Sequence, residues 1–256
     1  MIGPTPLLDF FKRGEVARDV RLLAAQGVLA PRAYEQLAIL VHLVDDPDAE
    51  VRGVADETLA RIPVEALERF LARSDVPIGL REFFADRGVF PAEIPAIEFD
   101  EPLIDGAPEE VPDDREEGAE SVIQMLAMMS FTDRLKAAIK GTREMRAILI
   151  RNPNKMISAA VLSSPKVTSS EVESFARMAN VSEDVLRTIA GNRSWLKNYG
   201  VVVGLTKNPK TPLALSLNMM SRLNDRDLTT LSVDRNVPEP LRIAARKRIL
   251  AGTSRG

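Results

Sequence analysis

The side chains that most often carry out catalysis are scarce in this sequence. It contains one histidine, His42, and no cysteine, so thiol catalysis, thiolate metal sites and disulfides are excluded. A serine nucleophile would need an imidazole base, and only His42 offers one. His42 lies in an apolar run from Leu37 to Val44, which favours a core or boundary position. Enzymes that use two carboxylates stay open, but no pair stands out, so we expect no catalytic residue and no enzyme.

Metal and phosphate sites also lack their usual residues. Asp45, Asp46 and Asp48 cluster, but the spacing of a calcium loop is missing and turn capping accounts for them. A single histidine without cysteine disfavours zinc. Neither a Walker lysine pattern nor a Gly-x-Gly-x-x-Gly turn occurs, and Gly200 and Gly204, one helical turn apart, predict close helix–helix packing. We expect no metal and no cofactor.

Binding residues are easier to nominate than catalytic ones. Trp195 and Tyr199 stand four apart beside Arg193 and Lys197, a combination that suits stacking on a base or gripping a peptide. The alternative is a ridge packed on the neighbouring helices.

A second candidate surface is a basic stripe. Its members are Arg143, Arg146, Arg151, Lys155, Arg242 and Arg246. One interpretation is an anion-binding surface; the other, for the residues near the C-terminus, is the solvated face of a terminal helix.

An internal repeat indicates the elements that must position these residues. Asparagine recurs every 28 residues, at Asn152, Asn180, Asn208 and Asn236, and an aliphatic residue follows each asparagine by five positions, namely Ile157, Val185, Leu213 and Leu241. A second apolar position follows one helical turn later. Each unit is therefore predicted to be a pair of short helices.

The recurring asparagine is expected to end the second helix of a pair in a left-handed conformation. After it, Ser182 or Ser169 is a candidate N-cap, and Thr211 with Pro212 is expected to be an N-cap followed by proline at the first helical position.

The same phase appears near the N-terminus with aspartate in place of asparagine, at Asp46 and Asp75. The string from Asp46 to Ala55, DPDAEVRGVA, followed by Leu59, resembles the second-helix pattern of HEAT repeats. The shorter units of about 28 residues look like the leucine-rich-repeat-variant relatives. The resemblance implies a curved α-solenoid whose concave surface binds a protein or a nucleic acid.

Charge divides the chain into three parts. Residues 93–120 carry twelve acids and one base, whereas residues 121–256 carry 22 bases and ten acids. Prolines at 91, 95, 102, 108 and 112 interrupt the acidic part and disfavour helix. We expect an N-terminal helical block (1–90), a disordered acidic linker (91–120) and a basic C-terminal helical-repeat block (121–256).

Three roles are open for the acidic linker. It is a spacer, or it folds back on the basic block and competes with an anionic ligand, or it is a short docking motif. The docking hypothesis rests on the apolar residues Ile94, Ile97, Phe99, Leu103 and Ile104, which stand among acids.

The sequence thus predicts an all-α protein, a short α-solenoid in two blocks joined by the linker. The leading functional hypothesis is a non-catalytic scaffold or adaptor that binds a protein partner and is regulated by the linker. The alternative is nucleic-acid binding by the basic block; a HEAT-like DNA-repair enzyme lacks a carboxylate beside the aromatic pair. No apolar run is long enough to insert in a membrane, and a cytoplasmic location is expected.

Overall fold

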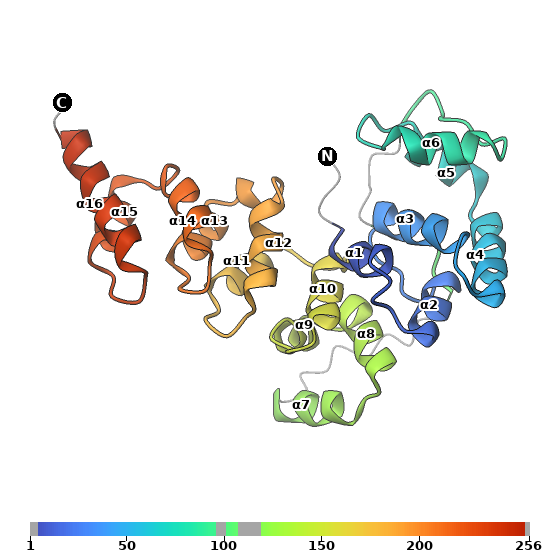
Figure 1. The fold of residues 1–256 in the computed structure, drawn as a ribbon, viewed down its shortest axis with the longest axis horizontal. Helices are drawn as coiled ribbons and strands as arrows, with labels where there is room; N and C mark the ends of the chain where they lie inside the picture. The colour runs from blue at the N-terminus through green and yellow to red at the C-terminus, as the bar shows by residue number, and fades with distance from the viewer. Residues whose placement is uncertain (1–4, 96–100, 107–118, 254–256) are drawn as a thin grey trace. The chain divides into compact units, whose positions relative to one another are not determined.

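The computed structural model describes residues 5–95, 101–106 and 119–253, and in these residues the protein is all-helical, as predicted (Figure 1). The described residues contain sixteen α-helices, one 3₁₀ helix and no strand. Two compact units divide the chain: unit 1 comprises Met1–Leu149 and Asn154–Val167, and unit 2 comprises Ile150–Pro153 and Thr168–Gly256.

Unit 1 contains ten helices within its described residues. They are α1 (Pro6–Lys12), α2 (Arg18–Ala25), α3 (Ala33–Leu43), α4 (Ala49–Arg61), α5 (Val64–Leu71), α6 (Ile78–Ala85), α7 (Ala119–Met128), α8 (Phe131–Lys140), α9 (Arg143–Leu149) and α10 (Lys155–Ser163). Helix α3 packs against α1, α2 and α4, and α10 packs against α1, α8 and α9. One apolar cluster joins α3–α6, with Leu37, Leu40, Phe70 and Phe84 among its buried members.

The boundary between the units lies near residue 167 and not in the acidic segment 91–120. Helix α10, which belongs to the predicted basic block, packs on α1, and the Arg32 N–H donates to the carbonyl of Ser163 over 3.2 Å. Of the predicted linker, residues 96–100 and 107–118 lie outside the described residues, so its predicted disorder stays a prediction. Residues 101–106 are described, and they lie against unit 1.

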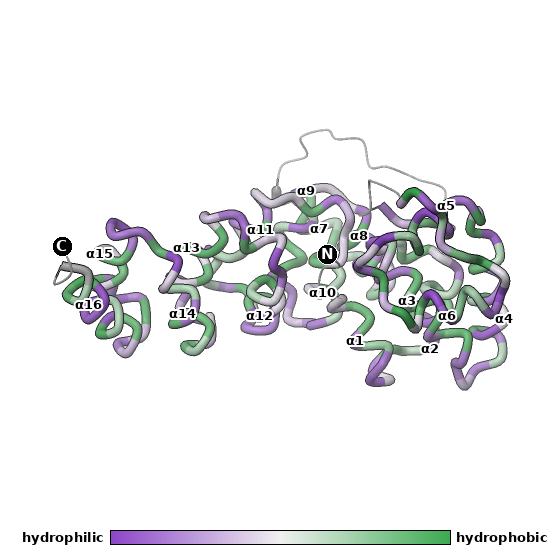
Figure 2. Tube along the Cα trace, turned by 90° about the horizontal axis from the view of Figure 1, so that it is seen from above, coloured by the Kyte–Doolittle hydropathy of each residue, from purple (hydrophilic) through white to green (hydrophobic). Residues whose placement is uncertain are grey.

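Unit 2 holds six α-helices and the 3₁₀ helix η1 among its described residues: α11 (Ser169–Arg177), α12 (Glu183–Gly191), η1 (Trp195–Lys197), α13 (Tyr199–Lys207), α14 (Leu213–Met220), α15 (Asp225–Val233) and α16 (Glu239–Thr253). Figure 1 shows α11–α16 following one another in chain order within this unit. Helix α11 packs on α13, and α14 packs on α16; within pairs, α13 packs on α14, and α15 on α16. Polar and apolar positions alternate along these helices (Figure 2), as helices with one buried face require.

All four recurring asparagines lie in connections between helices, as the repeat predicts. These connections join α9 to α10, α11 to α12, α13 to α14 and α15 to α16. In units counted from one asparagine to the next, such as α10 with α11, each of Asn180, Asn208 and Asn236 follows the second helix, as expected. Asp46 and Asp75 take the same place, between α3 and α4 and between α5 and α6.

The left-handed conformation expected for the asparagines is wrong. Among the described residues, only glycines have positive φ, and Asn208 has an extended backbone with φ −74° and ψ 123°. Its side chain explains the preference for asparagine. The Nδ2 group donates to the carbonyls of Ala176 and Met178 at the end of α11, each over 2.9 Å, and Oδ1 accepts from the Lys210 N–H over 3.0 Å.

The helix starts agree in part with the expected caps. Ser182 accepts from the Val185 N–H and caps α12, as predicted. The cap predicted at Ser169 is wrong, because Thr168 caps α11 and accepts from the Glu171 N–H. The cap predicted at Thr211 is wrong, because α14 begins one residue later, at Leu213, and the N-cap position is held by Pro212, which has no side-chain acceptor. The hydroxyl of Thr211 is buried and makes no hydrogen bond in the described part of the chain.

Candidate functional site

Helix α16 presents the clearest exposed apolar stripe of unit 2. Leu241 and Ala245 are buried against α14 and α15, while Ile243 and Leu250 on another side are 44% and 66% exposed. A shallow hollow of about 380 Å³ lies along this side, lined by Glu239, Pro240, Ile243, Ala244 and Lys247. We call these five residues and Leu250 the α16 stripe. Its apolar centre lies between the charged residues Glu239 and Lys247.

The arginines beside the α16 stripe, of which Arg242 and Arg246 were predicted to bind anions, are partly engaged within the chain. Arg246 Nε donates to the Ser232 carbonyl over 3.1 Å, and Arg248 donates to the Ser221 carbonyl over 3.1 Å. They thus bind carbonyls at the ends of α15 and α14, which carry the negative end of each helix dipole. Arg242 is half-buried, and its Nε has no hydrogen-bond partner among the described residues.

The structure does not bring Trp195 and Tyr199 together as an exposed aromatic patch. Trp195 is only 7% exposed, so it does not present a ring for stacking on a base. Tyr199 is exposed, but its hydroxyl donates to Asp227 over 2.7 Å and accepts from the Asn224 N–H over 3.1 Å. The second interpretation fits this geometry: Tyr199 joins α13 to α15. Arg193 and Lys197 lie exposed beside the buried Trp195.

A hydrogen-bond network fixes the charge of Asp227. Its second oxygen accepts from Lys207 over 2.9 Å. The hydrogen bonds from Tyr199 and Lys207 lower the pKa of Asp227, and the pKa of Tyr199 is raised, mainly by desolvation. Asp227 therefore stays ionised and Tyr199 stays protonated, and in these states their hydrogen bond joins α13 to α15.

The remaining basic candidates differ in exposure. Arg143, Arg151 and Lys155 are exposed, whereas Arg146 is only 5% exposed and donates to the Gly141 carbonyl over 2.7 Å. Arg146 therefore binds the end of α8 and is not part of an exposed anion-binding stripe. Arg143, Arg146 and Lys155 belong to unit 1, and Arg151 belongs to unit 2.

His42 is exposed, so the core or boundary position expected for it is wrong. Its Nε2 lies 3.2 Å from the carbonyl oxygen of Phe11. The apolar run around it misled the prediction, because Leu40 and Leu43 face the core while His42, between them, points away from it.

Residues 101–106 occupy a binding site around Gln36 that the sequence did not predict. We call this site the Gln36 seat. Gln36 in α3 is only 3% exposed, and its amide binds the backbone of this segment. Oε1 accepts from the N–H groups of Leu103 and Ile104 over 2.7 and 3.1 Å, and Nε2 donates to the Ile104 carbonyl. The Leu103 and Ile104 side chains pack against the apolar cluster of α3–α6. The contacts span 67 and 68 residues, so no local pattern announces them.

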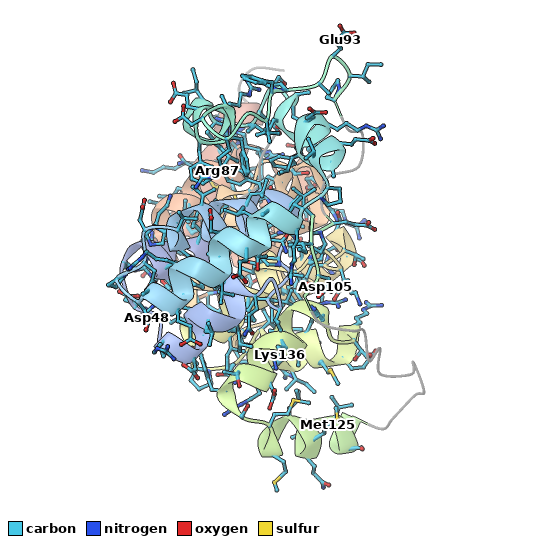
Figure 3. The ribbon with its side chains drawn as sticks, turned by 90° about the vertical axis from the view of Figure 1, so that its right-hand side faces the viewer. Asp48, Arg87, Glu93, Asp105, Met125 and Lys136 are labelled. Carbon is cyan, nitrogen blue, oxygen red and sulfur yellow. The ribbon has the colours of Figure 1, made fainter. Side chains whose placement is uncertain are left out.

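Two further contacts fix the C-terminal end of the segment. The Gly106 N–H donates to the Gly27 carbonyl over 3.2 Å, and Asp105 forms an ion pair with Lys140 of α8. Figure 3 shows Asp105 beside that helix. Of the five apolar residues proposed for docking, Leu103 and Ile104 dock on this chain itself, Ile94 is 76% exposed, and Ile97 and Phe99 lie outside the described residues.

Glu35 is the one carboxylate with a strongly raised pKa in the described part of the chain. It accepts from the N–H groups of Leu7 and Leu8 at the start of α1 over 2.7 and 3.0 Å. Burial raises its pKa from 4.5 to about 7, although these hydrogen bonds and Arg32 act in the opposite direction. Its contacts are those of a structural link between α3 and α1.

Neither a cluster of metal ligands nor a membrane-spanning helix occurs in the described residues. They contain no group of three or more His, Asp or Glu side chains arranged to hold a metal ion. No helix among them combines the length and the apolar character needed to cross a bilayer.

Comparison with known proteins gave no match to a family model, to a curated protein or to a solved structure.

Proposed function

We propose that this chain is a non-catalytic scaffold that binds a protein partner, and that its helix pairs stack as a short α-solenoid related to HEAT repeats. The observation that carries the proposal is the α16 stripe. An apolar centre with exposed Ile243 and Leu250, flanked by Lys247 and Arg246, has the composition of a protein-binding surface.

The partner that suits the α16 stripe is an amphipathic helix with acidic residues beside its apolar face. Pro240, Ile243 and Lys247 lie at helical spacing, and a shallow hollow follows them, so an approaching helix can lay apolar side chains along it. Acidic residues on the partner would complement Lys247 and speed association.

Nucleic-acid binding is the weaker alternative because basic side chains of unit 2 are engaged within the chain. Arg222 donates to the Leu196 carbonyl over 2.6 Å, and Arg187 pairs with Glu183 over 2.5 Å. With Arg246 and Arg248 on carbonyls, fewer cations remain for phosphates. Binding of DNA or RNA that falls steeply with salt would favour this alternative.

The test is capture of proteins from cells of the source by the immobilised full-length chain. We expect specific partners that are retained by wild type and reduced at least tenfold by the double substitution Ile243→Glu and Leu250→Glu. The matched control is Val64→Glu with Ile78→Glu, since both residues are exposed in unit 1. Equal capture by both double variants would contradict the proposed surface, and turnover of a substrate without any partner would contradict the proposed function.

A further inference from the structure

The seat around Gln36 has the features of a built recognition site for a peptide backbone. A glutamine that is 3% exposed must satisfy its amide inside the protein. The three hydrogen bonds of this amide all join it to backbone groups of Leu103 and Ile104. Because these contacts involve only backbone atoms of the segment, they recognise main chain that turns two successive N–H groups toward one acceptor, and not particular side chains.

Glycine on both sides allows the segment to approach this closely. A Cβ at Gly106 would collide with the Gln26 carbonyl oxygen, and a Cβ at Gly27 would lie 3.3 Å from Cγ2 of Ile104. Gly27 also has φ +74°, a conformation that other residues rarely adopt. The surface at Gly27 is therefore shaped to admit a second stretch of backbone.

Side chains supply the selectivity of the seat. Leu103 and Ile104 are half-buried against the apolar cluster of α3–α6, so two adjacent aliphatic residues fit. Asp105 pairs with Lys140, whose side chain is 25% exposed, so an acid fits next. The ion pair is partly solvated and is screened by salt.

We propose that the Gln36 seat is a protein-binding site for a partner segment with two adjacent aliphatic residues followed by an acid. Residues 101–106 occupy it as a built-in competing ligand. This site is separate from the α16 stripe, and its test does not depend on that surface.

The experiment uses a dye-labelled peptide with the sequence of residues 101–106, Glu-Pro-Leu-Ile-Asp-Gly, and full-length protein. Leu103→Ser with Ile104→Ser weakens the built-in ligand, and fluorescence polarisation measures binding of the peptide. We expect at least tenfold tighter binding to this variant than to wild type. Ile94→Ser is the matched control, since Ile94 is exposed and its loss leaves the seat occupied.

Two further variants test the named contacts. Gln36→Leu in the Leu103→Ser and Ile104→Ser background should weaken peptide binding at least tenfold. A peptide with Asp105→Asn should bind more weakly at low salt and lose less affinity as salt rises. Equal peptide binding by wild type and the weakened variant, or no effect of Gln36→Leu, would overturn the proposal.

Hydrogen exchange keeps the proposal testable if the weakened variant does not fold. In otherwise wild-type protein, Gln36→Leu removes the acceptor of the Leu103 and Ile104 amides and puts an apolar side chain of similar size in its place. We expect both amides to exchange at least tenfold faster, with the exchange of α13 unchanged. Unchanged exchange at Leu103 and Ile104 would show that Gln36 does not hold the segment.

Discussion

Glu35 couples helix α3 to the start of α1 through two buried hydrogen bonds. Helix α1 begins with Pro6 and has no side-chain cap of its own, so the carboxylate of Glu35 supplies an acceptor to the free N–H groups of its first turn. The stabilisation from these hydrogen bonds is offset by the cost of burying a charged carboxylate. Because burial disfavours the charged form, the pKa of Glu35 is raised to about 7.

The raised pKa of Glu35 predicts a dependence of stability on pH. Between pH 4.5 and 7 the unfolded chain releases this proton while the folded chain retains it, so the contribution of Glu35 to stability is greatest below 4.5 and falls as pH rises to about 7. Between pH 5 and 8, wild type should lose up to about 3 kcal/mol relative to Glu35→Gln. Urea denaturation of both proteins at several pH values measures the difference, since every other titrating group is shared. Parallel pH profiles would contradict the assignment.

Asn208 is predicted to be the most important of the four recurring asparagines. It is 4% exposed and makes three hydrogen bonds to backbone groups. Asn208→Ala should lower the free energy of unfolding by about 2–3 kcal/mol, because buried carbonyls of α11 lose their donor. Asn180 is at the equivalent position of another repeat but is exposed. Asn180→Ala should therefore change the free energy of unfolding by less than about 0.5 kcal/mol. Similar urea midpoints for the two variants would refute this distinction.

At the scale of elements, the close approach of α13 to α11 depends on glycine. Gly200 and Gly204 are predicted from their spacing to allow close helix packing, and α13 packs on α11 as expected. A Cβ at Gly204 would lie 3.1 Å from Cβ of Ala176 and from Cγ of Arg177, and a Cβ at Gly200 would meet the Glu173 carboxylate. The contact is therefore made by helix backbones and short side chains.

Filling this contact should separate the two helices. Gly204→Leu is expected to destabilise the protein by about 1–3 kcal/mol through overpacking. At Gly191, the exposed end of α12, an added Cβ would have no neighbouring atom within 4 Å, so Gly191→Leu should be neutral within about 0.5 kcal/mol or slightly stabilising. Thermal melting followed by circular dichroism compares them. A neutral Gly204→Leu would mean that α11 and α13 are not tightly packed.

At the scale of the whole molecule, local patterns in the sequence predicted the helices and their joints. The asparagine column, the aliphatic residues after it and the aspartates at 46 and 75 are read from spacing alone, and the connections lie where this spacing puts them. The conformation of Asn208 was not predictable in the same way, because its side chain binds carbonyls about 30 residues away.

The candidate site was less predictable than the fold because exposure depends on tertiary packing. Spacing alone put Trp195 beside Tyr199, but packing buries the indole and leaves the phenol on the surface. Gln36 carries no sequence signal, since its partners are the backbone of a segment whose composition suggested disorder. The exposed side of α16 was not predictable, because aliphatic and basic residues are mixed along residues 241–250 and the sequence does not show which of them face solvent.

The proposed function depends on one structural claim, that the helix pairs of unit 2 are modules in series, each tied to its neighbours. In such an arrangement stability is a sum of pair and interface contributions. Tyr199 and Lys207 of α13 bind Asp227 of α15. Removal of α15 and α16 should break these contacts and leave the contacts among α11–α14 in place.

The most direct test is to end the chain at Leu223, which removes α15 and α16, and to follow urea unfolding by circular dichroism. We expect the shortened chain to lose the helical signal of the removed residues, to keep a cooperative unfolding transition at a lower urea midpoint, and to retain protected amides in α11–α13. Loss of the helical signal and of amide protection throughout unit 2 would contradict it, because a single indivisible core would then hold these helices together.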